Sequence, residues 1–363
     1  MAKAKREQAL ENKCPSCTAS LKYNPKLEKF KCEYCGSEFT LEELKKYSNN
    51  ASTDEKNKPK EEQPRDTYDG YVSYHCESCG AEIVADEQTA ATFCVYCGNT
   101  AILKSKLSGE FTPNRMVPFK KEKDEVVETF KKLSKGRPLM PRSFNNEKNI
   151  EKIKGVYIPF WLYGVHVEGD VNMTGTIVTH WSHGDTHYTK TDTYKLVRGG
   201  HMDYHNIPVD GSSHFDNDIM NTLEPFEFND LIPYNHAYLS GFYAEKYDED
   251  GDKTYQEASV RALNSTRSYL QEEPKRYTAK VITSDTLQSK ETSKEYVMLP
   301  VWMVNVKYKD KMHIFAMNGQ TGKFIGNIPL DGKRVFLFTM MIFTISMIVC
   351  SIASYIIYLV GVK

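Results

Sequence analysis

The sequence predicts an α+β fold in which two small zinc ribbons precede a duplicated helix-plus-β-hairpin domain and one C-terminal transmembrane helix. Three observations carry this prediction. Eight of the nine cysteines form four Cys-x-x-Cys pairs, an apolar-Pro-apolar-Trp-apolar motif occurs twice, and the chain ends in a long apolar run. The expected units are a first ribbon at 1–47, a linker at 48–67, a second ribbon at 68–109, a mixed α/β domain at 110–330 and the transmembrane helix at 335–362.

The composition is that of a globular protein with room for two or three folded units. The chain has 363 residues, of which 40% are hydrophobic and 26% are charged. Its net charge of -1 excludes the basic surface that a chain binding nucleic acid along its whole length would need.

The cysteine spacing indicates a duplicated metal site. The eight paired cysteines recur at a constant offset of 62 residues, as Cys14, Cys17, Cys32 and Cys35, then Cys76, Cys79, Cys94 and Cys97. Each pair makes a tight turn whose two sulfurs point to one side, and two turns complete a tetrahedral Cys₄ site. Four thiolates leave no open position on the metal, so we expect two structural Zn²⁺ ions rather than a catalytic one. Four matched pairs also disfavour a redox function.

Between the two cysteine units, Ser48 to Thr67 has no aliphatic or aromatic residue except Ala51. Such a segment cannot bury apolar surface, and we expect a flexible linker. Within the first unit, alternation around Tyr23 and Phe30 predicts short ribbon strands.

The large domain repeats one motif, from Ile158 to Leu162 and again from Leu299 to Met303. Upstream, Val117-Pro118-Phe119 and Ile232-Pro233-Tyr234 also match, and each leads toward a predicted helix, at 123–133 and 254–270. We therefore expect two copies of a helix-then-hairpin unit around a shared core. Trp161 and Trp302 are expected to pack there, and a ligand groove lined by both is the alternative.

The apolar tail runs from Val335 to Val362 without a charge. About 20 apolar residues cross the hydrocarbon core of a bilayer, so this run is long enough to span it with a tilt. Lys333 and Arg334 precede the tail and only Lys363 follows it, which places the N-terminal domains in the cytoplasm. We expect a single-pass, tail-anchored protein of the cell membrane.

No catalytic motif is present. The sequence lacks a G-x-S-x-G elbow, an H-E-x-x-H motif, a dinucleotide fingerprint and a P-loop, so we expect neither an enzyme nor a cofactor-binding site. His180, His183 and His187 are expected at an exposed hairpin tip, with His183 and His187 on one face and His180 on the other.

These features together resemble a bacterial family labelled TFIIB-type zinc ribbon-containing protein. The resemblance rests on the double Cys₄ ribbon and on five segments: Val117–Phe119, Gly155–Trp161, Tyr238–Glu245, Leu299–Trp302 and Asn318–Lys323. It implies two ribbons, an uncharacterised domain and a membrane segment. Some relatives are encoded beside phage-shock-protein-A-like and SPFH/virion-core-like proteins, which implies a membrane scaffold that recruits such proteins during envelope stress.

The expected function is therefore a membrane-anchored zinc-ribbon adaptor that recruits cytoplasmic proteins, as a hetero- or homo-oligomer. The alternative is a membrane-tethered regulator that binds nucleic acid through the ribbons. Lys22, Lys26, Lys29 and Lys31 give the first ribbon a modest basic hairpin, whereas the corresponding stretch of the second, residues 81–93, has no Lys or Arg. The sequence favours protein partners over nucleic acid.

Overall fold

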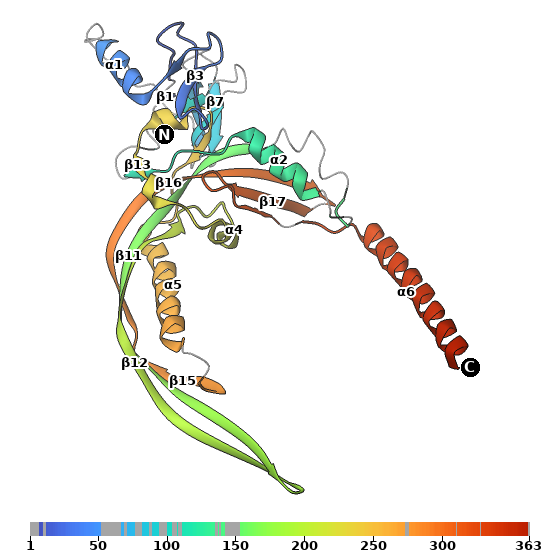
Figure 1. The fold of residues 1–363 in the computed structure, drawn as a ribbon. Coiled ribbons are helices and arrows are strands. Elements are labelled where there is room, and N and C mark those ends of the chain that lie inside the picture. Colours follow the sequence, from blue (N-terminus) through green and yellow to red (C-terminus); the bar gives the residue numbers. More distant parts are fainter. Residues whose placement is uncertain are drawn as a thin grey trace.

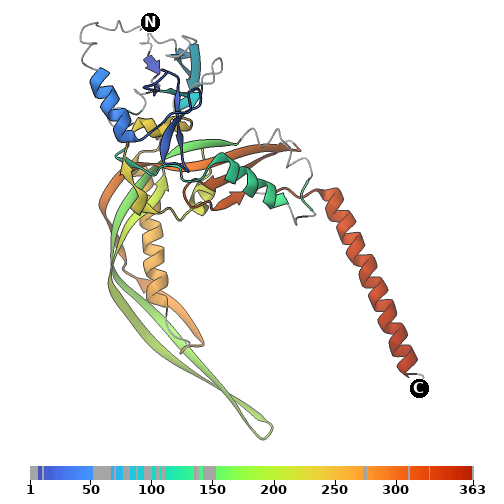
Figure 2. The same cartoon turned by 45° about the horizontal axis from the view of Figure 1, so that its top comes forward.

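The computed structural model describes residues 7–9, 12–51, 67–68, 71–76, 82–86, 89–93, 100–103, 107, 111–134, 137, 139–141, 153–272, 276–309, 311–326 and 328–361. Helices and strands are both present within these residues, as predicted. Figures 1 and 2 show a small N-terminal part that includes α1 (Leu41–Ala51), a large curved sheet beneath it, and the helix α6 (Gly332–Gly361).

The described strands form three sheets. The first contains β2 (Leu21–Asn24), β3 (Lys29–Cys32) and β4 (Glu38–Phe39). The second contains β1 (Glu7–Ala9), β5 (Thr67–Tyr68), β6 (Tyr71–Cys76) and β7 (Glu82–Asp86). The third has 11 strands: β8 (Thr89–Phe93), β9 (Thr100–Ile102), β10 (Arg115–Met116), β11 (Lys154–His183), β12 (Thr186–Asp210), β13 (Ile232–Pro233), β14 (Tyr243–Glu245), β15 (Ala279–Asp285), β16 (Gln288–Tyr308), β17 (Lys311–Asn318) and β18 (Phe324–Gly326).

The largest feature is a curved arm made by β11 and β12, which are 30 and 25 residues long (Figure 1). They pair antiparallel from Phe160 and Asp210 to the tip, where His183 lies opposite Thr186. The tip turn contains Gly184 with a φ of +58°, a conformation that glycine adopts without strain. The histidine stretch is thus an exposed hairpin tip, as predicted.

The arm bends at a β-bulge next to Gly164. The pairing of β11 with both β12 and β16 shifts register between residues 163 and 165. A bulge increases the local twist and bends the strand. A Cβ atom at Gly164 would clash with the hydroxyl groups of Thr292 and Ser293, which would have to move to admit a side chain.

Helix α5 (Gly251–Gln271) lies along the concave side of the arm (Figure 1). Its N-terminus is capped by Asp250, whose carboxylate accepts the backbone N–H of Asp252. Small residues recur every four positions on its buried stripe, as Thr254, Ala258, Ala262 and Thr266. Because these side chains are short, the helix can pack closely against Val165 and Val167 of β11, which are fully buried.

The two proline–tryptophan motifs are direct neighbours in the sheet. In the antiparallel pairing of β11 with β16, Ile158 lies opposite Leu299. Trp161 and Trp302 are both buried in one hydrophobic cluster. The expected helices form as α2 (Lys123–Ser134) and α5, close to their predicted bounds. Two facing copies of one unit would give this pairing; the duplication itself stays a prediction.

Two boundaries differ from the sequence-based units. Helix α1 continues to Ala51, so Ser48 to Ala51 are helical rather than linker, and residues 52–66 lie outside the described residues. In the second cysteine unit, β7 pairs with β6, whereas β8 pairs with β14 and extends the large sheet. Local sequence cannot show these pairings, because β14 is about 150 residues away in the chain.

Helix α6 is long and apolar enough to cross a membrane. The most apolar 18-residue part of Gly332–Ile356 has a mean hydropathy of 2.4, and none of it is buried against the other residues that the structure describes. Its start is fixed to the body, because Asp331 N–H donates to Leu139 O at 2.9 Å and Arg334 Nη1 donates to Met140 O at 2.8 Å.

Candidate metal centre

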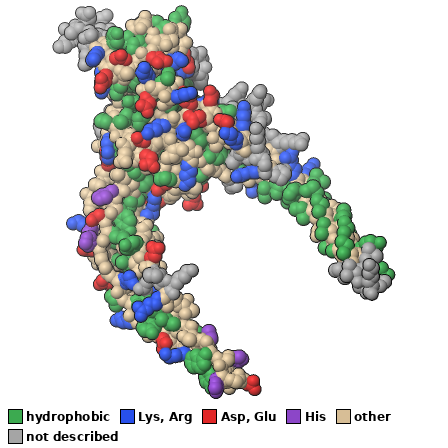
Figure 3. Space-filling model, viewed as in Figure 1, with side chains coloured by type: hydrophobic (Ala, Val, Ile, Leu, Met, Phe, Trp, Pro, Cys, Tyr) green, Lys and Arg blue, Asp and Glu red, His purple; other side chains and the backbone are tan. Residues whose placement is uncertain are grey.

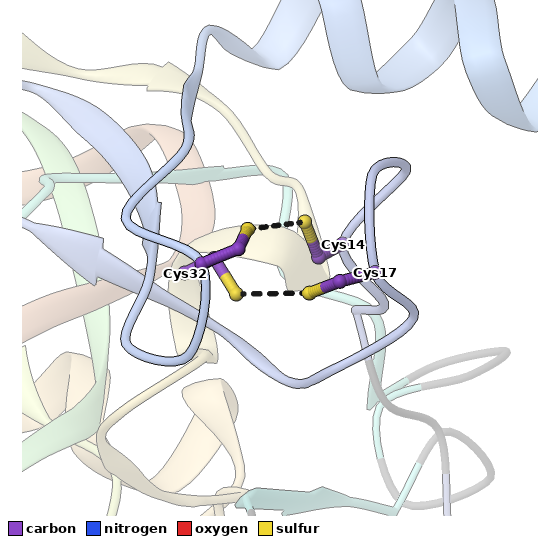
Figure 4. A group of neighbouring side chains, drawn as sticks. Cys14, Cys17 and Cys32 are labelled. Carbon is purple, nitrogen blue, oxygen red and sulfur yellow. Dashed lines mark hydrogen bonds between the residues drawn. The ribbon is translucent and has the colours of Figure 1, made fainter.

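The first cysteine unit brings four thiols together. The thiols of Cys14, Cys17, Cys32 and Cys35 lie within 4.8 Å of one another (Figure 4). Cys14 Sγ is 3.7 Å from Cys35 Sγ, and Cys17 Sγ is 3.5 Å from Cys32 Sγ. A tetrahedron with Zn–S bonds of about 2.3 Å places its sulfurs about 3.8 Å apart. The four residues fit one tetrahedral metal ion such as Zn²⁺.

The backbone builds the two cysteine turns in the same way. In the first, Thr18 N–H donates to Cys14 O at 2.8 Å, and in the second Gly36 N–H donates to Cys32 O at 2.9 Å. Both turns need a residue with positive φ directly after their second cysteine. The second turn has Gly36 at +75°, whereas the first has Thr18 at +63°. A β-branched residue is strained in this conformation. The backbone of the first turn is therefore strained at Thr18, and the rest of the ribbon must stabilise it.

The thiols differ in their surroundings. Cys14 and Cys32 are buried, Cys17 is half-buried and Cys35 is exposed. Hydrogen bonds with the side chain and backbone of Ser37 lower the pKa of the Cys35 thiol to about 6. The thiolate is the form that binds metal, so this contact prepares Cys35 as a ligand.

The second predicted site cannot be compared in the same way. Cys79, Cys94 and Cys97 lie outside the described residues, and of Cys76 only the backbone, at the end of β6, is described. A second zinc ion therefore stays a prediction.

The first ribbon is packed against the large domain. Tyr23 N–H donates to Ser240 O at 3.0 Å, and the ring of Tyr238 contacts the rings of Tyr23 and Phe30 at centroid distances of 4.9 and 5.4 Å. Tyr238 belongs to the short helix η5 (His236–Leu239). These contacts join the core of the ribbon to the core of the domain. A change that unfolds the metal site would therefore also disrupt this interface.

A cleft of about 590 Å³ lies between the ribbon and the large domain. Its apolar surface includes Phe93, Phe242, Tyr243 and Trp302. Its charged residues are the lysines Lys22, Lys31, Lys123 and Lys154 and the acids Glu33, Glu122 and Asp124. The size is that of a typical ligand or peptide site. Trp302 lines this cleft and Trp161 does not.

Two of the cleft lysines have defined partners, one in an ion pair and one in a cation–π contact. Lys22 Nζ lies 2.7 Å from Glu33 Oε2, and Lys154 Nζ lies 4.5 Å from the centre of the Tyr243 ring. Lys22 and Lys31 come from the ribbon strands β2 and β3, so one wall of the cleft exists only when the ribbon is folded.

The histidines of the arm do not form a metal site in the described residues. His180 and His187 share one face of the hairpin and His183 lies on the other, because Ser182 is the residue opposite His187. The predicted pairing of His183 with His187 on one face is wrong, since the turn reverses the chain between them. His180 and His187 instead bond to Thr189 and Ser182 across the strands.

Comparison with known proteins gives one relative of similar length. The uncharacterized protein YdjG of Bacillus subtilis (strain 168) is 34% identical over 313 residues, which cover 73% of this chain and 92% of the relative. No family model matches the chain. No solved structure matches it either.

Proposed function

We propose, starting from the fact that this chain belongs to the same family as YdjG of Bacillus subtilis, that it is a membrane-anchored zinc-ribbon adaptor. The first ribbon and the large domain would bind a cytoplasmic protein, and α6 would hold the complex at the bilayer. The observation that carries the proposal is the cleft between ribbon and domain, one wall of which depends on the Cys₄ fold.

The chemistry of the cleft fits a peptide segment of a protein partner. Aromatic side chains offer a surface for an apolar anchor, and Lys31 and Lys123 stand among the charged residues around it. An acidic segment with one large apolar side chain would satisfy both features. Zinc would act at a distance, by holding β2 and β3 in place.

The finer parts of the proposal rest on the sequence. They are Zn²⁺ as the metal, a second ion on the second cysteine set, a cytoplasmic location of the domains and insertion in the cell membrane. The family resemblance suggests SPFH/virion-core-like and phage-shock-protein-A-like proteins as partners, and envelope stress as the setting. We propose no catalytic role for this protein.

Site-specific photo-crosslinking in cells tests the cleft. A photoreactive residue replaces Lys123 in the cleft, and the matched control replaces Lys253, an exposed lysine on α5 away from it. We expect a protein partner to crosslink from position 123 and not from 253, and to be lost when Cys14→Ser and Cys17→Ser are added. Equal crosslinking from both positions, or crosslinking unaffected by the cysteine changes, would refute the proposal.

The alternative is nucleic-acid binding by the ribbon lysines. It predicts an affinity that falls steeply with salt, because counterions are released from the phosphates. Salt-dependent binding of DNA or RNA by the purified full-length protein, lost on replacing Lys29 and Lys31, would favour this alternative over the adaptor.

A further inference from the structure

The tip of the arm carries an exposed aromatic pair. Trp181 of β11 lies directly opposite Tyr188 of β12, and their rings stack at a centroid distance of 5.4 Å and an angle of 9°. Trp181 is 48% exposed and Tyr188 is 43% exposed. The other tryptophans, Trp161 and Trp302, are only 9% and 6% exposed. A stacked Trp–Tyr pair in water at the far end of a two-stranded arm has no role in the core.

This pair belongs to the face of the β11–β12 ribbon that α5 covers nearer the body. The pairing of β11 and β12 is regular from Val165 to His183, so alternate residues keep to one face. Val165 and Val167 point toward α5, where they are buried in one cluster with Ala258 and Ala262. Trp181 has the same parity as these valines and shares their face.

The end of the arm is unusually poor in charge. Residues 171–189 contain one ionised group at neutral pH, Asp185 in the tip turn, apart from histidines. In the whole chain 26% of residues are charged. Threonine, serine and histidine take the place of Lys and Glu. This composition suits the polar interface of a bilayer, where Trp and Tyr are enriched, better than a strand that must stay soluble by charge.

The arm and α6 leave the body on the same side. Figures 1 and 2 show both limbs extending away from the N-terminal part, and Figure 3 shows the open space between them. The hydrogen bonds of Asp331 and Arg334 to residues 139 and 140 fix the start of α6 on the body. The direction of the anchor relative to the arm is thus set by contacts.

We infer that the tip of the arm rests in the headgroup region of the bilayer that α6 enters, with Trp181 and Tyr188 as its interfacial contacts. The bound partner of this surface is lipid, recognised by aromatic rings and neutral polar groups rather than by charge. The inference requires α6 to span a bilayer, but it does not require the protein to recruit other proteins.

The arm stays in the interface and does not cross the membrane. Beyond Val178, whose N–H donates to Thr278 Oγ1, the arm is a two-stranded hairpin within the described residues, and no neighbouring strand pairs with its edges. Such edges are not tolerated in hydrocarbon. Figures 1 and 2 show that the tip reaches further from the N-terminal part than the far end of α6. A bilayer surface that contains both the tip and the start of α6 is therefore crossed by α6 at a tilt. A helix of 30 residues is about 45 Å long against a core of about 30 Å, which leaves room for this tilt.

Tryptophan quenching by lipid tests the inference on the full chain. The protein is placed in phosphatidylcholine nanodiscs made with a tryptophan-free scaffold, with either ordinary or acyl-brominated lipid. Trp181→Phe is the matched variant, because it keeps an aromatic ring at an exposed position. We expect brominated lipid to quench part of the wild-type emission and to have almost no effect on the variant, since Trp161 and Trp302 are buried in the body. We also expect this quenching to persist at high salt.

Two results would overturn the inference. In the first, brominated lipid affects wild type and Trp181→Phe equally while aqueous iodide quenches Trp181 freely, which would place the tip in water and leave it for a protein partner. In the second, brominated lipid quenches Trp181 when the protein and the brominated lipid are in separate vesicles that are mixed, but not in nanodiscs. The tip would then contact a second membrane.

Discussion

Trp161 and Trp302 make the same hydrogen bond in two places. The indole Nε1 of Trp161 donates to Glu249 O at 3.0 Å, two residues before α5 begins, and Nε1 of Trp302 donates to Lys121 O at 2.9 Å, two residues before α2 begins. Each tryptophan comes from the strand of one predicted copy and donates to the backbone just before the helix of the other. The two hydrogen bonds therefore join the halves of the large domain.

Replacing either tryptophan by phenylalanine should destabilise the protein by a similar amount. The change leaves a carbonyl without its donor and removes part of a buried ring, for which we expect about 1–3 kcal/mol. Thermal unfolding in detergent, followed by circular dichroism, measures it. Trp181→Phe is the control and should leave the midpoint unchanged. An unchanged midpoint in Trp161→Phe or Trp302→Phe would contradict the equivalence.

Metal content should report two independent sites. We expect two zinc ions per full-length chain, one in Cys14→Ser/Cys17→Ser and one in the matched variant Cys76→Ser/Cys79→Ser, by elemental analysis after dialysis. The contrary result is a wild type that holds one ion, which is lost in Cys14→Ser/Cys17→Ser and kept in Cys76→Ser/Cys79→Ser. That result would restrict the metal to the first ribbon.

The two cysteine turns should respond oppositely to changes of their positive-φ residue. Gly36→Ala forces a side chain into a left-handed conformation and should lower the stability of the zinc-bound ribbon by about 1 kcal/mol, although nothing lies within 4 Å of the added Cβ. Thr18→Gly should not lower it, because glycine relieves the strain. Zinc retention against increasing chelator compares the two. Loss of zinc in Thr18→Gly equal to that in Gly36→Ala would reject this account.

Asp210 should make stability depend on pH. It is fully buried, neither carboxylate oxygen has a hydrogen-bond partner among the residues that the structure describes, and burial raises its pKa to about 7. The folded state thus prefers the protonated form, so the contribution of Asp210 to stability is present below about pH 4 and is lost as the pH rises through 7. Asp210→Asn should stabilise the protein at pH 8, by at most about 4 kcal/mol, and change little at pH 4. Unfolding at both pH values checks this, and an equal effect at both would contradict it.

Local features of the chain were open to prediction. The spacing of Cys14, Cys17, Cys32 and Cys35 is enough to anticipate the thiol cluster, because two tight turns on one hairpin can hardly place the sulfurs elsewhere. The apolar run and the periodic helices are similarly local. The turn from Asn318 to Gly322 is local too, because Asn318 Oδ1 accepts the N–H groups of Gln320 and Thr321.

Long-range arrangement was not open to prediction. Tyr23 and Ser240 bond across 217 positions of sequence, and nothing near Tyr23 indicates which part of the domain the ribbon contacts. The exposed residues of the arm alternate as any strand would, so its length and its pairing with β16 depend on the whole sheet. The burial of Asp210, at the end of β12, likewise follows from packing and not from its neighbours in sequence.

Purification of partners from membranes tests the central claim most directly. The intact protein and Cys14→Ser/Cys17→Ser are isolated in detergent from cells, with co-purified proteins identified by mass spectrometry and zinc measured in the same samples. We predict a specific set of proteins with the intact form that is absent from the variant, although the variant still reaches the membrane through α6. The same set on both forms, or none on either, would contradict zinc-dependent recruitment.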